Sequence, residues 1–234
     1  MEDRKTSFLI DLKSPFLLET KFSPDIRANN NRLITDASDQ LDRLINAGLL
    51  GGGNFLVITG VCSLPVSYLI ATRLGHVYGA IAINDPKLAE PTKPRYVIAI
   101  SHSPDYHLGD ISELNDDKLK IISHIIEVKK PTATFSIELE EDILQIDFNQ
   151  LEPASNDLIV RDADNRLTQL ISDKILTAGE LLKINGPASL PVGYAIAHKV
   201  CHLFKTIAIF DPKMAKYVVV KTSSPKYALG QMLS

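Results

Sequence analysis

The chain carries one unusual stretch of sequence twice, and this repeat constrains its fold more than any other feature. Residues 58–87 and 184–213 align without a gap at an offset of 126 residues, with 16 of 30 positions identical. The identities include polar and turn-forming residues in fixed register. The repeat extends until each copy fills about half of the 234 residues, which is typical of a domain and too long for a solenoid repeat. We therefore predict two tandem domains, residues 1–120 and 121–234, forming an intramolecular pseudo-dimer.

The composition favours a soluble globular protein. The chain is 45% hydrophobic, enough for two modest cores. Its net charge of −3 argues against broad binding to double-stranded DNA. No apolar run is long enough to span a bilayer and the first residues lack a signal-peptide core, so we expect a cytoplasmic protein without a membrane partner. Cys62 and Cys201 occupy non-equivalent repeat positions, which argues against a symmetric disulfide or a zinc cluster.

Each copy has the pattern of a β-hairpin, a polar helix and a strand–helix–strand unit. A glycine in the turn between the first strand and the helix of that unit indicates a βαβ unit, so the expected class is α/β with a Rossmann-like core. Residues 113–131, which connect the copies, look partly helical. The predicted strands are 8–12, 17–22, 55–58, 80–84, 96–100, 135–139, 143–148, 181–184, 206–210 and 217–220, and the polar helices are 38–47 and 165–176.

A Gly-x-x-Ser motif at the start of the central helix is the first candidate for chemistry. It places backbone amides and a hydroxyl at a helix N-terminus, with the serine as the expected N-cap, and this arrangement suits a phosphate group. A plain helix start explains one such motif better than a ligand site does, but its recurrence favours a ligand site. The candidate binding residues are Gly60, Ser63, Pro65, Gly186, Ser189 and Pro191, with the hydroxyl-rich loops Ser101, His102, Ser103, Thr222, Ser223 and Ser224.

An Asp-Pro-Lys turn and a histidine also recur in register. The turn has a plain structural explanation, but Lys87 and Lys213 would bring cations near the helix N-termini. His76 and His202 end the central helix, where a histidine often interacts with the helix dipole. Their recurrence makes a functional role an equal alternative. His198 has Thr72 as its counterpart in the first copy, so we do not treat it as essential.

The string G-x(2)-S-L-P-x(2)-Y-x-I-A-x(4)-H-x(8)-D-P-K resembles the Csx-three family of CRISPR-associated proteins, also called the Crn-three ring nucleases. Family members have a minimal CRISPR-associated Rossmann fold, act as homodimers and bind a tetra-adenylate across the two-fold axis. They cleave cyclic tetra-adenylate, the second messenger of type III CRISPR defence, and a manganese-dependent RNA 3′-deadenylase activity is also attributed to them. The resemblance implies catalytic roles for His76, His202, Asp85 and Asp211.

The geometry of a βαβ unit separates these residues. The helix N-terminus and the strand ends share one edge, so we expect Gly60, Ser63, Asp85 and Ser101 there. His76 should lie at the opposite edge, about 17 Å away. We therefore predict that a ligand bound on one molecule meets the histidines of a second molecule, stacked head to tail. Histidine would move the proton of an attacking ribose 2′-hydroxyl without any metal cofactor.

Two other function classes remain open. A non-catalytic sensor or sink for the cyclic nucleotide is favoured by the second copy's tail, where Ser223 and Gln231 replace the histidine and aspartate of the first. A manganese-dependent exoribonuclease acting on linear RNA 3′ ends is the other class. Retained cleavage of the cyclic substrate in EDTA would distinguish the ring nuclease from the exoribonuclease.

Overall fold

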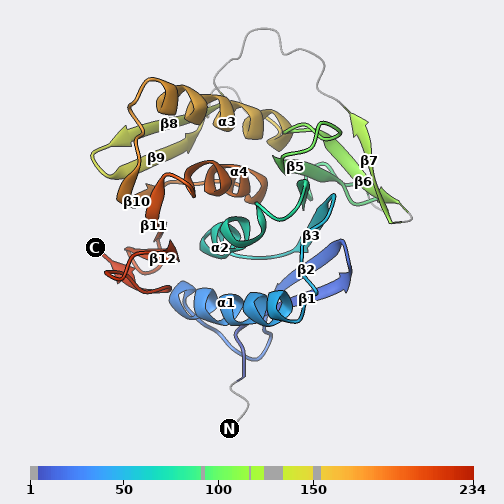
Figure 1. Ribbon diagram of the computed structural model, residues 1–234, viewed down its shortest axis with the longest axis horizontal. Helices are drawn as coiled ribbons and strands as arrows, with labels where there is room; N and C mark the ends of the chain where they lie inside the picture. Colours follow the sequence, from blue (N-terminus) through green and yellow to red (C-terminus); the bar gives the residue numbers. More distant parts are fainter. Residues whose placement is uncertain (1–4, 91–92, 116, 124–133, 150–153) are drawn as a thin grey trace.

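Two β-sheets enclose a layer of four helices in the computed structural model, which describes residues 5–90, 93–115, 117–123, 134–149 and 154–234 (Figure 1). The helices are α1 (Asn30–Asn46), α2 (Leu64–Leu74), α3 (Asn156–Ser172) and α4 (Leu190–Val200). The first sheet contains β1 (Phe8–Ser14), β2 (Leu17–Phe22), β3 (Leu56–Gly60), β4 (Ala80–Asn84), β5 (Tyr96–Ser101), β6 (Ile111–Asn115) and β7 (Lys118–Ser123). The second contains β8 (Phe135–Glu140), β9 (Ile143–Phe148), β10 (Gly179–Asn185), β11 (Phe204–Asp211), β12 (Lys216–Thr222) and β13 (Met232–Leu233).

The two sheets share one topology, as the repeat predicts. In the first sheet, β1 and β2 form an antiparallel hairpin, β2–β3 and β3–β4 are parallel pairs, and β4–β5 is antiparallel. The second sheet has the same order of pairings. The strands adjoin in sequence order, from β1 to β7 and from β8 to β13. The predicted α/β class and its βαβ unit are therefore confirmed, because β3 and β4 are parallel and α2 connects them.

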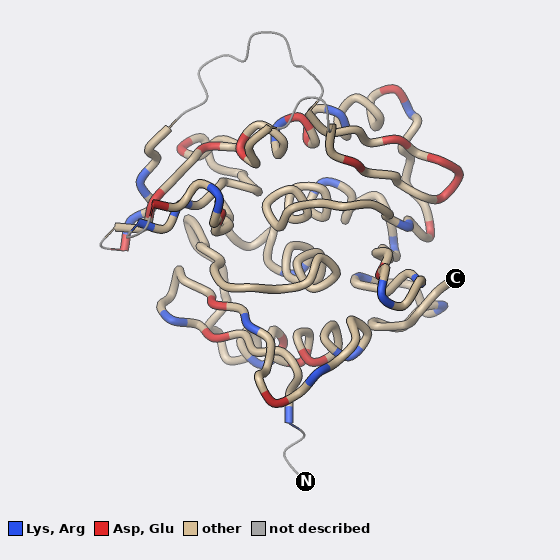
Figure 2. The backbone as a smooth tube through the Cα atoms, turned by 180° about the vertical axis from the view of Figure 1, so that it is seen from behind, with Lys and Arg blue, Asp and Glu red and all other residues tan. Residues whose placement is uncertain are grey.

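The helices lie in the order α1, α2, α4, α3 across the middle of the molecule (Figure 1). Helix α2 contacts α4 and the strands β11 and β12 of the other copy, while α4 contacts β4 and β5. Charged residues lie mainly on the outer helices and hairpins, and the two central helices are mostly uncharged (Figure 2). One apolar cluster consequently spans both copies, instead of the two separate cores expected from the sequence.

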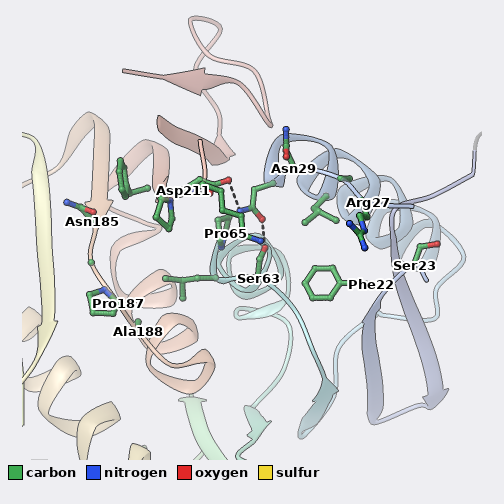
Figure 3. A pocket seen from close by; sticks show the side chains of 18 of the residues that line it. Phe22, Ser23, Arg27, Asn29, Ser63, Pro65, Asn185, Pro187, Ala188 and Asp211 are labelled. Atoms are coloured by element: carbon green, nitrogen blue, oxygen red, sulfur yellow. Dashed lines mark hydrogen bonds between the residues drawn. The ribbon is translucent and has the colours of Figure 1, made fainter. Parts of the chain in front are cut away.

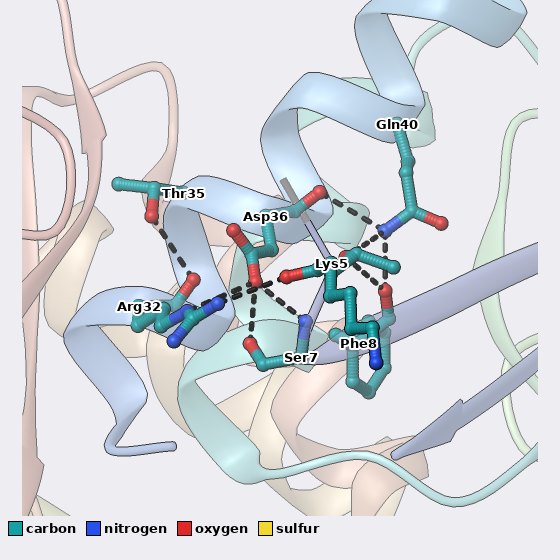
Figure 4. A network of polar contacts seen from close by, with 8 residues as sticks. Lys5, Ser7, Phe8, Arg32, Thr35, Asp36 and Gln40 are labelled. Atoms are coloured by element: carbon teal, nitrogen blue, oxygen red, sulfur yellow. Dashed lines mark hydrogen bonds and ion pairs between the residues drawn. The ribbon is translucent and has the colours of Figure 1, made fainter. Parts of the chain in front are cut away.

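The outer helices begin about two turns earlier than predicted. Asp36 lies within α1, and its carboxylate accepts hydrogen bonds of 2.6 Å from the backbone N and the hydroxyl of Ser7 (Figure 4). Gln40 accepts from the backbone N of Ile10 at 3.0 Å and donates to the carbonyl of Phe8. Because β1 is an edge strand, these bonds occupy backbone groups that would otherwise be exposed. The polar residues of α1 thus fasten the helix to the sheet.

The connection between the copies is also different from the prediction. Ile111–Asn115 and Lys118–Ser123 pair as the β6–β7 hairpin, which extends the first sheet; residues 116 and 124–131 of the predicted partly helical stretch lie outside the described residues. Lysines alternate with Leu119 and Ile121, a period typical of a strand, and both apolar side chains pack on the outer face of the sheet. The predicted domain boundary at residue 120 falls within β7.

The glycine of the Gly-x-x-Ser motif has a structural requirement. Gly60 has a φ of +93°, and a Cβ there would lie 2.0 Å from the carbonyl oxygen of Thr20. Gly186 has a φ of +121°, and its Cβ would lie 1.8 Å from the carbonyl oxygen of Ile146. No L side chain fits such a close approach. The chain therefore needs glycine where each strand turns towards the central helix.

Among the described residues, no helix is both long and apolar enough to cross a membrane.

Candidate ligand pocket and histidine cluster

A cavity of about 1050 Å³ lies where the N-terminal end of α2 meets the second copy (Figure 3). Its walls come from both copies: residues 22–23, 26–30, 33 and 63–65 from the first, and residues 185–188 and 210–213 from the second. Arg27 and Lys213 are the cations that line it. The cavity is therefore built between the copies, and of the predicted binding residues it contains Ser63, Pro65, Gly186 and Lys213.

A hydrogen-bonded triad joins the two copies at this pocket. The hydroxyl of Ser63 donates to Oδ1 of Asn30 at 2.5 Å, and the amide Nδ2 of Asn30 donates to Oδ2 of Asp211 at 2.9 Å (Figure 3). Asn30 begins α1, Ser63 precedes α2, and Asp211 ends β11 of the other copy. One asparagine thus connects a helix start of the first copy to the Asp-Pro-Lys turn of the second.

The same triad recurs with the copies exchanged. The hydroxyl of Ser189 donates to Oδ1 of Asn156 at 2.7 Å, and Nδ2 of Asn156 donates to Oδ2 of Asp85 at 2.8 Å. We call the two sets the cross-copy triads. The two asparagines stand 126 residues apart, at equivalent positions of the repeat, although neither was predicted as a site residue. Gly60, Lys87, Ser189 and Pro191 belong to this second half-site and do not line the cavity described above.

The aspartates of the repeated turn are buried, with 2% of their surface exposed. Besides the asparagine amide, each carboxylate accepts a bond from the backbone N two residues on, at 3.0 Å from Lys87 to Asp85 and 2.9 Å from Lys213 to Asp211. Each side chain therefore shapes its own turn and holds the opposite copy. These contacts support a positioning role beside the catalytic one that the resemblance implies.

Both serines stand at the predicted N-cap positions, with extended backbone at Ser63 and Ser189. Within the described residues, however, no side-chain bond caps either helix, because each hydroxyl is engaged by its asparagine. The first-turn amides of α2 and α4 are thus left without a side-chain acceptor, beside a helix end that carries a partial positive charge. This combination can bind an anionic group such as a phosphate.

The hydroxyl-rich loops lie at the opposite edge from the pocket, so the prediction that they join it was wrong. Strand β5 runs antiparallel to β4, and Ser101 at its end pairs with Ala80 at the start of β4. In the second copy Thr222 pairs with Thr206 for the same reason. The sequence pattern gave two strands but not their relative direction. The residues that were predicted at the pocket edge and lie at the opposite edge are Ser101, His102, Ser103, Thr222, Ser223 and Ser224.

Four histidines gather at that opposite edge, at the C-terminal ends of α2 and α4. The rings of His76 and His202 are 4.2 Å apart between centroids, and His198 lies 4.8 Å from both His76 and His102. Nε2 of His76 lies 3.2 Å from Sγ of Cys201. The structure therefore brings the two predicted catalytic histidines, His76 and His202, together. It adds His102, His198 and Cys201, which were not predicted to be catalytic. We call these five residues the histidine cluster.

The surroundings of His76 and His198 favour their neutral imidazoles. Burial, followed by the neighbouring His202 and His102, lowers the pKa of His76. Burial and the three other histidines lower the pKa of His198 to about 3. Neutral imidazole nitrogens accept protons and bind metal ions. Two sets of three, His76 with Cys201 and His202, and His76 with His102 and His198, have ligand atoms that lie within 4.8 Å of one another.

The pocket and the cluster are separated by the length of the central helices. Each helix has 11 residues and is about 16 Å long. The helices are parallel, because Gly193 of α4 lies against Leu64 and Ser67 at the start of α2, while His198 lies against Gly75 at its end. Both N-termini consequently face the pocket edge, and both C-termini bear the histidine cluster.

Fold and geometry together define a two-sheet α/β protein with a pocket between its copies and a histidine cluster at the far end of the central helices. Residues 163–234 match the family model of a CRISPR-associated protein (Cas_csx3). That stretch begins within α3 and includes α4, His202 and the second Asp-Pro-Lys turn. The resemblance to the Csx-three family is confirmed over these residues. No curated protein matches the chain.

Proposed function

We propose that the protein binds cyclic tetra-adenylate at the pocket edge and cleaves it, which would end type III CRISPR signalling. The observation that carries this proposal is the duplicated cross-copy triad, which pairs two helix N-termini about a pseudo-two-fold axis. A cyclic tetranucleotide is also two-fold symmetric and presents phosphates on opposite sides. The family match of residues 163–234 supports the same CRISPR-associated context.

The cavity has the properties that such a ligand requires. Its volume of about 1050 Å³ is at the upper end of the range of roughly 300–1,000 Å³ for small-molecule sites. Arg27 and Lys213 supply positive charge, and the first-turn amides of α2 supply hydrogen-bond donors. Phe22, which is 42% exposed at the cavity wall, offers an aromatic face to a base.

Cleavage would use the histidine cluster of a second molecule. A ribose 2′-oxygen attacks the adjacent phosphorus while the bond to the 5′-oxygen breaks, giving a 2′,3′-cyclic phosphate and a free 5′-hydroxyl. Histidine accepts the 2′-proton and returns a proton to the 5′-oxygen. Because His76 and His202 lie a helix length from the pocket of their own molecule, head-to-tail stacking is needed to place them at a bound ring.

Two alternatives have observations of their own. For a manganese-dependent exoribonuclease, the histidine cluster supplies metal ligands, since His76, His102 and His198 form a set of three imidazoles, although manganese favours oxygen ligands. The engagement of Asp85 and Asp211 in structural bonds suits a non-catalytic sensor or sink. Cleavage of the ring in EDTA is the outcome that separates our proposal from both.

The decisive experiment is incubation with cyclic tri-, tetra- and hexa-adenylate in EDTA, with the products separated by chromatography. We expect linear products with 2′,3′-cyclic phosphate ends from the tetra-adenylate. The double variant His76→Ala, His202→Ala should lose roughly 100-fold or more in rate, whereas the exposed His107→Ala should retain the wild-type rate. Binding without turnover would identify a sensor, and turnover only with added Mn²⁺ would identify a metal-dependent nuclease; either result contradicts the proposal.

A further inference from the structure

The histidine cluster contains a thiol that the proposed cleavage does not use. Cys201 follows α4, is buried, and holds its Sγ 3.2 Å from Nε2 of His76 of the other copy. His202 is the next residue, and its ring packs on that of His76 at 4.2 Å. One soft and two nitrogen donors therefore meet from the ends of two parallel helices.

We propose that His76, Cys201 and His202 form a binding site for a zinc-class transition-metal ion. Tetrahedral zinc has bonds of about 2.0–2.3 Å, which place neighbouring ligand atoms roughly 3.3–3.8 Å apart. The separation of 3.2 Å between His76 and Cys201 is close to this range, and all three ligand atoms lie within 4.8 Å of one another. Small side-chain rotations are enough to complete the geometry, because His76 and His202 are exposed.

The donor set determines which metal the site prefers. A thiolate is a soft ligand and favours zinc or cobalt, whereas manganese prefers oxygen ligands. Three protein ligands leave one position open for water or an anion, as in catalytic zinc sites. The thiol of Cys201 donates to the carbonyl oxygen of His198 at 3.0 Å. A bound metal would remove that proton.

The site depends on how the two copies have diverged. Cys201 stands where the first copy has Gly75, and His198 where it has Thr72. A Cβ at Gly75 would lie 2.9 Å from Nδ1 of His198, so glycine leaves the space that this imidazole occupies. That Nδ1 is buried and has no hydrogen-bond partner among the described residues. The alternative set of His76, His102 and His198 shares His76 with the proposed set but contains no sulfur ligand.

Cobalt is a suitable probe, because a cobalt–thiolate bond gives a charge-transfer band in the near ultraviolet. Titration of the full-length protein with Co²⁺ should give this band at one equivalent, and Zn²⁺ should displace it. Cys201→Ser should abolish the band and weaken Zn²⁺ binding at least roughly tenfold, with Mn²⁺ binding nearly unchanged. Cys62→Ser is the matched control, since the chain has two cysteines, and should behave as wild type.

The outcomes are independent of ring cleavage. Circular dichroism spectra of Cys201→Ser and the wild type should coincide, and Cys201→Gly, which carries the residue of the first copy, provides a second variant. The proposal fails if the wild type binds Co²⁺ without a thiolate band, if either Cys201 variant keeps the band, or if Cys62→Ser loses it. A protein that binds metal but leaves cyclic tetra-adenylate intact would refute the proposed function alone.

Discussion

Asp85 and Asp211 show at the residue scale how one side chain can unite two copies. Each is buried and accepts one bond from its own turn and one from the opposite copy's asparagine. A group used only for proton transfer would not need both bonds. The aspartates therefore stabilise the architecture that carries the pocket.

Replacing either aspartate by alanine should destabilise the protein. Each change leaves a half-buried asparagine amide and a backbone N–H without this acceptor, at a cost of about 1–3 kcal/mol in the free energy of unfolding. Urea denaturation should show a lower midpoint with an unchanged slope. Asp142→Ala, at a half-exposed side chain, should change stability by less than about 0.5 kcal/mol. Unchanged midpoints combined with lost cleavage would instead assign the aspartates a catalytic role alone.

The elements around the two tails have changed together. The loop between β5 and β6 places Asp110 beside α3, where Arg161 lies 3.5 Å from its carboxylate and donates to the carbonyl of Leu108 at 2.6 Å. The equivalent junction lies between the tail of the second copy and α1 of the first copy. There Gln231 stands in the place of Asp110, and Thr35 stands in the place of Arg161. Gln231 keeps the bond that closes its own loop, from the backbone N of Ala228 at 2.8 Å. The loss of the aspartate thus has a structural counterpart.

A double-mutant cycle at this junction should show coupling. Arg161→Thr removes the charge next to the fully buried carboxylate of Asp110 and should cost about 3 kcal/mol. Adding Asp110→Gln gives this junction the threonine and glutamine found at the other junction. The double variant should recover at least half of the lost stability. Arg43→Thr, at an exposed arginine of α1, should cost less than about 1 kcal/mol. Additive effects of the two changes, measured by urea denaturation, would exclude the coupling.

The elements also show what a sequence can predict here. Periodicity located the strands and central helices, and several bounds, such as Ala80–Asn84, agree with the structure. The hydrophobic pattern does not show whether neighbouring strands are parallel or antiparallel, so His102 was assigned to the wrong edge of the sheet. Asn30 and His198 were missed for different reasons. The first was visible in the repeat, but the second arises from packing against Gly75, which only the structure shows.

At the scale of the whole molecule, the helical layer places two kinds of chemistry at opposite ends. The helix N-termini that we propose as the ligand site face one edge, and the histidine cluster faces the other, about 16 Å away. Complementary surfaces at opposite ends of a molecule favour head-to-tail association. Such stacking would bring together the groups that the proposed cleavage requires, which neither end carries alone.

Mixing two inactive variants provides the test of this arrangement. One variant, His76→Ala with His202→Ala, keeps the pocket, and the other, Arg27→Glu with Lys213→Glu, keeps the histidines. Each alone should cleave cyclic tetra-adenylate at least roughly 100-fold more slowly than the wild type. Their mixture should recover a substantial fraction of the rate, because the intact pocket of one molecule meets the intact histidines of another. Light scattering should show that wild-type particles become larger when cyclic tetra-adenylate is added. A mixture as inactive as its components, or full activity in a strictly monomeric complex, would show that cleavage does not occur between stacked molecules.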